Sequence, residues 1–200
     1  MNENKKQLSK PSKEIVAKYV EKWNNNEMYV NLDKILFDMC EKNQSNTDVY
    51  SVYIKCCVIN ATESTQVPNK DLYDIAKNIT AVKDIDNRIK SGDLSVVIDI
   101  AECGIGKNLY SFAAKYCCAH NKNAFPKKDE LVVNMLQELN EYKFTKKVNK
   151  TALNNYKNYE QFVNVINDFR NHFGLNEFSY KEIDQYLWQV GKTLKANKRI

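Results

Sequence analysis

Residues 103–129 read CGIGKNLYSFAAKYCCAHNKNAFPKKD, and this stretch carries the main signals for both fold and function. Gly104 and Gly106 form a short turn ahead of an apolar, helix-like run, and Asp129 follows a proline at position 126. Because glycine has no Cβ, such a turn lets backbone N–H groups approach a phosphate at the positive N-terminal end of the next helix. Asp129, which follows that helix, can then act on the molecule that carries the phosphate.

The whole chain predicts an all-α fold. It contains 5 glycines and 3 prolines in 200 residues, too few for the turns that a sheet of hairpins requires. Apolar residues at helical spacing predict early helices around residues 15–23, 32–39 and 49–57. Further helices are expected over residues 69–80, 83–91, 93–101, 107–120, 127–140, 159–173 and 179–195. We therefore expect a compact array of about nine or ten helices.

The domain organisation follows from composition. Residues 1–10 are polar and rich in lysine, and we expect them to form a mobile arm. Residues 11–200 are long enough for one helical domain, either undivided or in two lobes around a cleft.

Several helix ends carry local signals. Gly92 is placed to end one helix, and Asp93 can cap the next. Gly174 closes a later helix, and Ser179 with Glu182 has the form of a capping box. Residues 95–100 could form a buried strand by composition, but no partner strand is evident, so a helix is favoured.

Charge and cysteine usage limit the class of protein. A net charge of +5 and a pI near 8.7 permit binding to a polyanion without requiring it. Cys117 and His120 could supply two metal ligands, but no second pair at comparable spacing exists, so no metal site is expected. No signal peptide and no apolar run long enough to span a bilayer is visible. These features predict a cytoplasmic protein with reduced thiols and no membrane partner.

Three segments, in order, resemble the helix-hairpin-helix DNA glycosylase superfamily, which includes endonuclease III and 8-oxoguanine glycosylase. Residues 103–107 are similar to the hairpin that grips the DNA backbone, and residues 125–132 to the loop that carries the catalytic aspartate. Residues 58–62 are similar to a family segment that leaves a helix and places a polar residue into the gap left by a flipped base. The resemblance covers about residues 47–140 and is closest to small bacterial members of the superfamily.

The resemblance implies base excision repair, in which the protein binds duplex DNA, flips a damaged or modified base and cleaves its N-glycosidic bond. Asp129 would then stabilise the positive charge that develops on the sugar. Its alternative role is the ordinary N-cap of the following helix. The residues that the resemblance assigns to DNA binding are Gly104, Ile105, Gly106, Lys107, Asn108 and Asn60.

Bifunctional members of the superfamily add a lysine that attacks the sugar and forms a Schiff base, which gives lyase activity. Two lysines compete for this role. Lys107 falls one position before the family's lysine site, which Asn108 occupies, and Lys115 lies two turns further along the same helix. The family's iron–sulfur cluster uses four cysteines near the C-terminus, and no cysteine follows Cys118 here, so no cofactor is expected.

Aromatic residues are the candidates for stacking on an extruded base. The four singled out are Tyr110, Phe112, Tyr116 and Trp188. For each of them, packing in the core is the simpler alternative.

A second function class stays open, a helical protein without catalysis that binds nucleic acid or a protein partner as a regulatory, phage-related or plasmid-related factor. The position of Asp129 distinguishes the enzyme from the binding protein. An enzyme requires Asp129 to face a cleft together with the turn at Gly104–Gly106, whereas a cap that points to solvent favours the binding protein.

Overall fold

The computed structural model describes residues 8–197, and all regular secondary structure in this range is helical. The α-helices are α1 (Lys13–Asn24), α2 (Glu27–Lys42), α3 (Val49–Thr62), α4 (Leu72–Thr80), α5 (Ile85–Ser91), α6 (Val96–Glu102), α7 (Tyr110–His120), α8 (Glu130–Leu139), α9 (Lys150–Leu153), α10 (Tyr159–His172) and α11 (Tyr180–Asn197). Three 3-10 helices, η1 (Asn69–Asp71), η2 (Asn140–Tyr142) and η3 (Tyr156–Asn158), extend or join them. The all-α prediction is confirmed. The additional helix is α9, a single turn too short to show periodicity.

In the segment 95–100, where a strand was the alternative, Ser95 is the N-cap of α6 and residues 96–100 form most of this helix. The predicted starts of two later helices were three residues too early. α7 begins at Tyr110 because the left-handed Gly106, with φ of 70°, interrupts the helical path before it. α8 begins at Glu130 because Asp129 is extended and serves as its N-cap.

The predicted end signals are largely present. Gly92 ends α5 with a left-handed backbone conformation, and its N–H donates to the carbonyls of Arg88 and Ile89. Asp93 does not cap α6 directly, because its side chain accepts from the N–H of Ser95, two residues on, and so holds the preceding turn.

The capping box at the start of α11 is confirmed. The N–H of Ser179 donates to Glu182 at 2.7 Å, and the N–H of Glu182 donates back to the Ser179 hydroxyl at 3.3 Å. Each side chain satisfies a backbone N–H that the first turn of a helix leaves without a partner.

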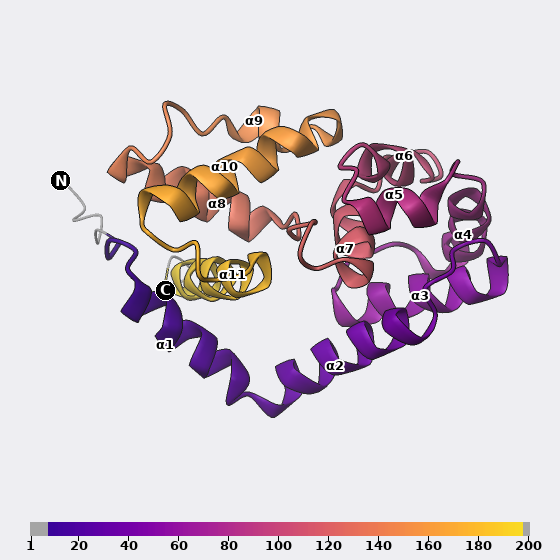
Figure 1. Ribbon diagram of the computed structural model, residues 1–200, viewed down its shortest axis with the longest axis horizontal. Helices are drawn as coiled ribbons and strands as arrows, with labels where there is room; N and C mark the ends of the chain where they lie inside the picture. Colours follow the sequence, from indigo (N-terminus) through magenta and orange to yellow (C-terminus); the bar gives the residue numbers. More distant parts are fainter. Residues whose placement is uncertain (1–7, 198–200) are drawn as a thin grey trace.

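Helices α3 to α7 lie on one side of the molecule, and α1 and α8 to α11 lie on the other (Figure 1). α2 runs along both groups and contacts α1, α3 and α7. In the first group α3 packs on α4 and α6 on α7, whereas in the second α11 packs on α8 and α1. One cluster of buried apolar side chains runs through both groups.

α7 is the central helix. Apart from Ser111 and His120, its side chains are buried, and this includes Lys115 at 5% exposure. A helix that is apolar on all sides belongs in a core. A lysine inside such a helix therefore needs partners nearby.

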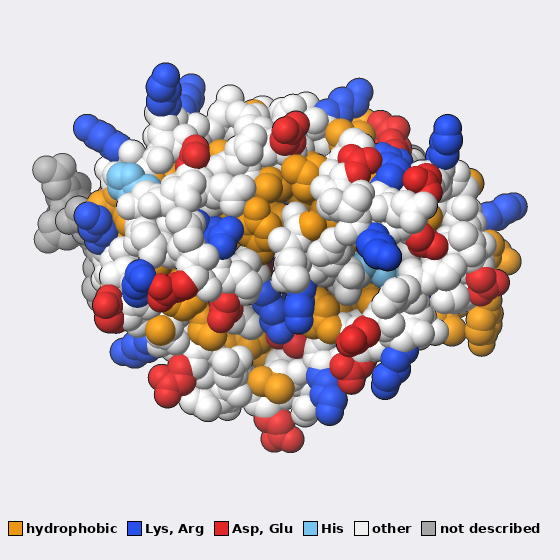
Figure 2. Space-filling view, viewed as in Figure 1, with side chains coloured by type: hydrophobic (Ala, Val, Ile, Leu, Met, Phe, Trp, Pro, Cys, Tyr) orange, Lys and Arg blue, Asp and Glu red, His pale blue; other side chains and the backbone are white. Residues whose placement is uncertain are grey.

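The surface mixes both signs of charge. On the face shown in Figure 2, lysine and arginine side chains are interspersed with aspartate and glutamate rather than gathered in one patch. Within residues 8–197, no helix has both the length and the apolar character needed to cross a membrane.

Only part of the predicted N-terminal arm falls in the described range, since residues 1–7 lie outside it. Leu8 packs against the core, and its carbonyl accepts a hydrogen bond from the Tyr142 hydroxyl. The chain is thus docked from Leu8 onward.

Candidate functional site

A cavity of about 320 Å³ lies where the two groups of helices meet. Its charged lining residues are Asp33, Glu63, Lys115, Lys127, Asp129, Asp184 and Lys192, and its large apolar and aromatic ones are Trp23, Met28, Tyr29, Leu32 and Trp188. These side chains come from α1, α2, the end of α3, α7, the start of α8, and α11. Distant parts of the sequence therefore build one site.

Lys115 and Asp129 meet in this cavity, with the ammonium nitrogen of Lys115 3.4 Å from Oδ2 of Asp129. The other carboxylate oxygen, Oδ1, accepts from the N–H of Leu131 at 2.8 Å. Lys115 also donates to the backbone carbonyl of Glu63 at 2.9 Å. Asp129 thus caps α8 and faces the cavity at the same time, so its role as a cap does not remove its carboxylate from the cavity.

Two further ion pairs surround the site. Lys127 lies 2.6 Å from Glu63, and the side chains of both are almost fully buried. Burial opposes the charged form of Lys127, but the surrounding carboxylates, Glu63 above all, outweigh it and raise the pKa of this lysine. Lys181 lies 2.9 Å from Asp33, which also accepts from the indole N–H of Trp23. Because desolvating ion pairs is costly, these pairs are weak evidence for stability, and such groups of buried charges are a common feature of functional sites.

Asp184 is a cavity residue that sequence reasoning missed. Its Oδ1 atom is buried and has no hydrogen-bond partner. Burial raises its pKa to about 7, against the opposing effect of Lys127 and with additional repulsion from Asp129. Both protonation states are therefore populated near neutral pH. Its spacing from Trp188, one turn later on α11, was the signal that could have found it.

Aromatic rings form one wall of the cavity. The ring centroids of Trp23 and Tyr29 lie 4.5 Å apart, and that of Trp188 lies 5.7 Å from Trp23 and 5.8 Å from Tyr29. The ammonium of Lys192 sits 4.5 Å from the Trp188 ring centroid. The chain contains two tryptophans, and both line this cavity. Of the four aromatics singled out from the sequence, Trp188 lies at the site.

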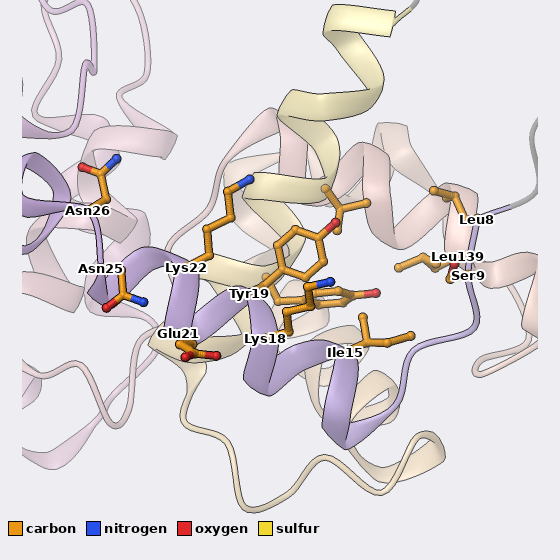
Figure 3. Close-up of a pocket in the computed structure, with 12 residues that line it drawn as sticks. Leu8, Ser9, Ile15, Lys18, Tyr19, Glu21, Lys22, Asn25, Asn26 and Leu139 are labelled. Carbon is orange, nitrogen blue, oxygen red and sulfur yellow. The ribbon is translucent and has the colours of Figure 1, made fainter.

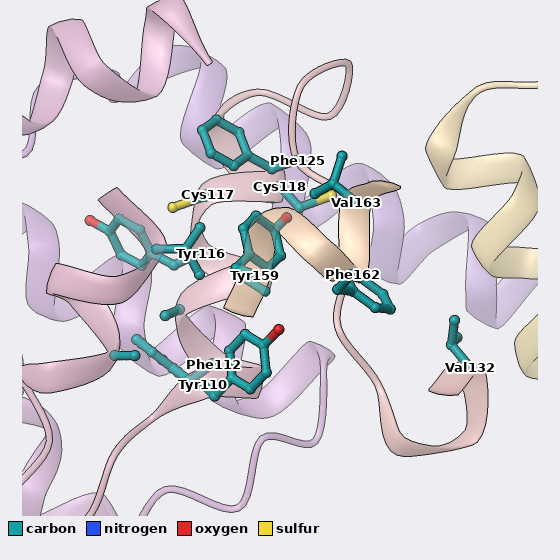
Figure 4. Close-up of a cluster of buried hydrophobic side chains, with 14 of the residues drawn as sticks. Tyr110, Phe112, Tyr116, Cys117, Cys118, Phe125, Val132, Tyr159, Phe162 and Val163 are labelled. Carbon is teal, nitrogen blue, oxygen red and sulfur yellow. The ribbon is translucent and has the colours of Figure 1, made fainter. Parts of the chain in front are cut away.

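The other three lie in the core (Figure 4). Tyr110 packs edge-on against Tyr159, with ring centroids 6.2 Å apart. Phe112 and Tyr116 are 2% and 0% exposed, and the Tyr116 hydroxyl donates to Asn46. Core packing therefore accounts for these three side chains, because α7 is enclosed on all sides.

The glycine turn does not line the cavity. Gly106 adopts φ of 70°, and a Cβ on Gly104 would lie 2.0 Å from the carbonyl oxygen of Lys107, so the turn requires both glycines. Ile105, Lys107 and Asn108 are exposed at its tip. Lys107 is thus at the surface, whereas Lys115 is the lysine that the fold brings to Asp129.

The turn and Asp129 are connected through the start of α7. The Ser111 hydroxyl donates to the carbonyl of Lys128 at 2.9 Å, and the Lys128 ammonium lies 5.0 Å from the Tyr110 ring centroid. The structure therefore does not place Asp129 and the glycine turn at one cleft, as the expectation for an enzyme required. The glycine turn sits on the surface, and the helix that follows it carries Lys115 into the cavity.

Asn60 does not project freely, as a residue that fills a vacated base position would. Its amide is bonded within the turn that follows α3, to Thr65 and to both backbone groups of Val67. The role that the resemblance gives to Asn60 would require these bonds to break.

A larger surface cavity of about 880 Å³ lies along α1, beside α8 and α11 (Figure 3). Tyr19, Lys18, Lys22 and Glu21 are among its lining residues. None of the candidate site residues named from the sequence lines this cavity. Over the described range, no three His, Cys, Asp or Glu residues are grouped so that they could hold a metal ion.

The family described as the HI_0787 N-terminal domain matches residues 15–128, more than half of the chain. The chain belongs to this family. The HI_0787 N-terminal domain region covers α2 to α7 and most of α1, so it supplies Glu63, Lys115 and Lys127 to the cavity. Asp129, Asp184 and Trp188 come from the part of the chain that follows the match.

One relative comes from Haemophilus influenzae and is described as an uncharacterized protein. It is 39% identical over 126 residues, which is 62% of this chain and 58% of the relative. The chain therefore matches little more than half of the length of this relative. No solved structure gives a significant match to the chain.

Proposed function

We propose that this protein is a DNA glycosylase that binds duplex DNA, takes a flipped, damaged or modified base into the cavity between its two groups of helices and cleaves the N-glycosidic bond. The observation that carries the proposal is the Lys115–Asp129 pair, 3.4 Å apart, inside a cavity walled by Trp23, Tyr29 and Trp188. A base-excising enzyme needs both parts, a carboxylate for the sugar and aromatic surface for the base.

The cavity suits a small planar ligand. Its volume of about 320 Å³ is at the lower end of the range for small-molecule sites. The aromatic wall offers stacking, and Asp184 offers an unpaired carboxyl oxygen to a polar group on the base. In its protonated form, Asp184 can donate a proton to the departing base, since its pKa is about 7.

Asp129 would act on the sugar. As the base leaves with the bonding electron pair, positive charge develops at the anomeric carbon, and a nearby carboxylate stabilises it. The hydrogen bond from Leu131 to Oδ1 fixes the orientation of the carboxylate, so Oδ2 stays directed at Lys115 and the cavity.

Lyase activity would use Lys115. Its amine, once neutral, would form a bond to the anomeric carbon while the bond to the base breaks. The ring would then open, with the bond between the anomeric carbon and the ring oxygen breaking and the oxygen taking a proton, and the resulting Schiff base would permit strand cleavage by elimination of the 3′ phosphate. Burial of Lys115 and its position beside Asp129 support this assignment over Lys107.

The glycine turn at Gly104–Gly106 and the exposed Lys107 would contact the DNA backbone, as the resemblance to helix-hairpin-helix glycosylases implies. DNA as partner, a cytoplasmic location and a role in base excision repair all belong to this proposal.

The test is a base-release assay on a panel of duplexes that each carry a different damaged or modified base, with the Asp129→Asn variant alongside. Release from at least one duplex, abolished by the substitution, is the expected result. Duplex binding with no release from any lesion would instead support the alternative of a non-catalytic nucleic-acid-binding protein.

A further inference from the structure

The turn after α3 borders the cavity through Thr62, Glu63 and Ser64. Ser64 and Gln66 both adopt left-handed backbone conformations, with φ of 49° and 59°. Residues with a Cβ rarely adopt this conformation, and they keep it only where surrounding contacts enforce it. The contacts that enforce it here therefore shape the edge of the cavity.

From the last turn of α3, Asn60 bonds to Thr65 and Val67, the residues on either side of Gln66. Its Oδ1 accepts from the Thr65 hydroxyl at 2.6 Å and from the N–H of Val67 at 3.0 Å. Its Nδ2 donates to the Val67 carbonyl at 2.9 Å and to Asn69 at 3.4 Å. One side chain thus holds both backbone groups of Val67 and closes the turn.

Residues of this turn also bind the Lys115 ammonium. The carbonyl of Glu63 accepts from the Lys115 ammonium at 2.9 Å, which is closer than Oδ2 of Asp129 at 3.4 Å. The Glu63 side chain is anchored separately, 2.6 Å from Lys127. Of the two oxygens that receive the ammonium, the one provided by this turn makes the shorter contact.

We infer that Asn60 is a positioning residue of the site. By fixing the turn at residues 63–67, it aims the Glu63 carbonyl at Lys115 and so sets the position and availability of the Lys115 amine beside Asp129. The importance of that amine rests on the proposed function, whereas the arrangement that controls it does not.

The first experiment needs no DNA. Lysines are alkylated with formaldehyde and cyanoborohydride, and labelling of Lys115 relative to the exposed Lys107 is measured by peptide mass spectrometry. In Asn60→Ala the carbonyl acceptor is no longer held in place, and we expect relative labelling of Lys115 to rise several-fold. Thr65→Val removes one contact to Asn60 and should raise it less.

Asn69→Ala is the matched control, because it removes only the long 3.4 Å contact and should leave labelling unchanged. A folded Asn60→Ala variant with unchanged Lys115 labelling would overturn the inference. If Asn60→Ala does not fold, Thr65→Val decides the question by the same criterion.

The second experiment measures kcat and KM for base release. Misplacement of Lys115 should lower kcat by about 10- to 100-fold with little change in KM. If the wild-type protein releases no base but labelling responds as expected, the proposed function fails and the positioning role stands. If the wild-type protein releases a base and Asn60→Ala changes neither the labelling of Lys115 nor kcat, the positioning role fails and the proposed function stands.

Discussion

Asp129 divides its carboxylate between two partners, since Oδ1 accepts from the N–H of Leu131 at 2.8 Å and Oδ2 lies 3.4 Å from the ammonium of Lys115. The first contact is a helix cap and the second belongs to the cavity. One residue therefore ties the start of α8 to the middle of α7, and its two contributions can be separated experimentally.

Asp129→Asn should keep the cap and remove the charge. Asparagine caps helices as well as aspartate does, but losing the charge leaves the buried Lys115 ammonium without its carboxylate partner, so the free energy of unfolding should fall by about 1–3 kcal/mol. Base release should fall by about 10²-fold or more, because the carboxylate acts in the chemical step. Asp48→Asn is the control, since Asp48 caps α3 through Ser51 and does not line the cavity. Equal release by Asp129→Asn and wild type would remove the catalytic role.

Lys115→Gln should abolish covalent trapping to DNA by borohydride, because only a Schiff base is reduced to a stable cross-link. Lys107→Gln should trap as well as wild type while binding duplex DNA more weakly, with roughly one fewer counterion released in the salt dependence. Trapping that depends on Lys107 would reverse the assignment made from the geometry.

Both tryptophans line the cavity, so intrinsic tryptophan fluorescence reports on this site alone. Binding of a duplex with an extruded base should quench it. Trp188→Ala should weaken lesion binding by about 1–3 kcal/mol, the usual contribution of a stacked base. Tyr73→Ala, which removes an exposed aromatic packed on Tyr53, is the control. Lesion affinity that is insensitive to Trp188 would place the base elsewhere.

Asp184 should make stability depend on pH. Burial raises its pKa in the folded protein to about 7, above its value in the unfolded chain. The protonated form of Asp184 thus contributes fully to stability below the pKa of the unfolded chain, and this contribution is lost as the pH rises to about 7. The Asp184→Asn side chain cannot ionise. Between pH 5 and pH 8, the free energy of unfolding of wild type should therefore fall by roughly 1–3 kcal/mol relative to that of Asp184→Asn. Parallel pH profiles of the two proteins in denaturant unfolding would contradict the assignment.

Gly106→Ala and Gly174→Ala form a matched pair. Both glycines have left-handed backbones, with φ of 70° and 65°, and a Cβ at either position meets open space. Each substitution should therefore cost a similar ~1 kcal/mol of stability. Only Gly106→Ala should also weaken duplex binding, measured by fluorescence anisotropy at fixed salt. Equal affinities of the two variants would argue against a DNA contact at the glycine turn.

The local sequence pattern was sufficient to predict the helices and several of their ends. The end of α5 at Gly92 and the capping box at Ser179 depend on residues within one turn of each other, and the structure has them as predicted. Asp129 was singled out by the resemblance to helix-hairpin-helix glycosylases, and Lys115 was one of two candidate lysines until the structure placed it beside Asp129.

The rest of the site could not be predicted in this way. Asp184 and Trp23 are far from Asp129 in the chain, and no local pattern indicates that α1 and α11 pack around the same cavity. Tyr110 and Tyr116 show the reverse, since their aromatic character suggested a base pocket but the enclosure of α7 places them in the core.

The sequence by itself determined the helical class and several helix ends, because these depend on residues close together in the chain. Only the tertiary structure decided which lysine meets Asp129, which aromatic rings line the cavity and which carboxyl is left buried without a partner. Burial and distance between remote segments control those outcomes, and they are set when the two groups of helices pack together.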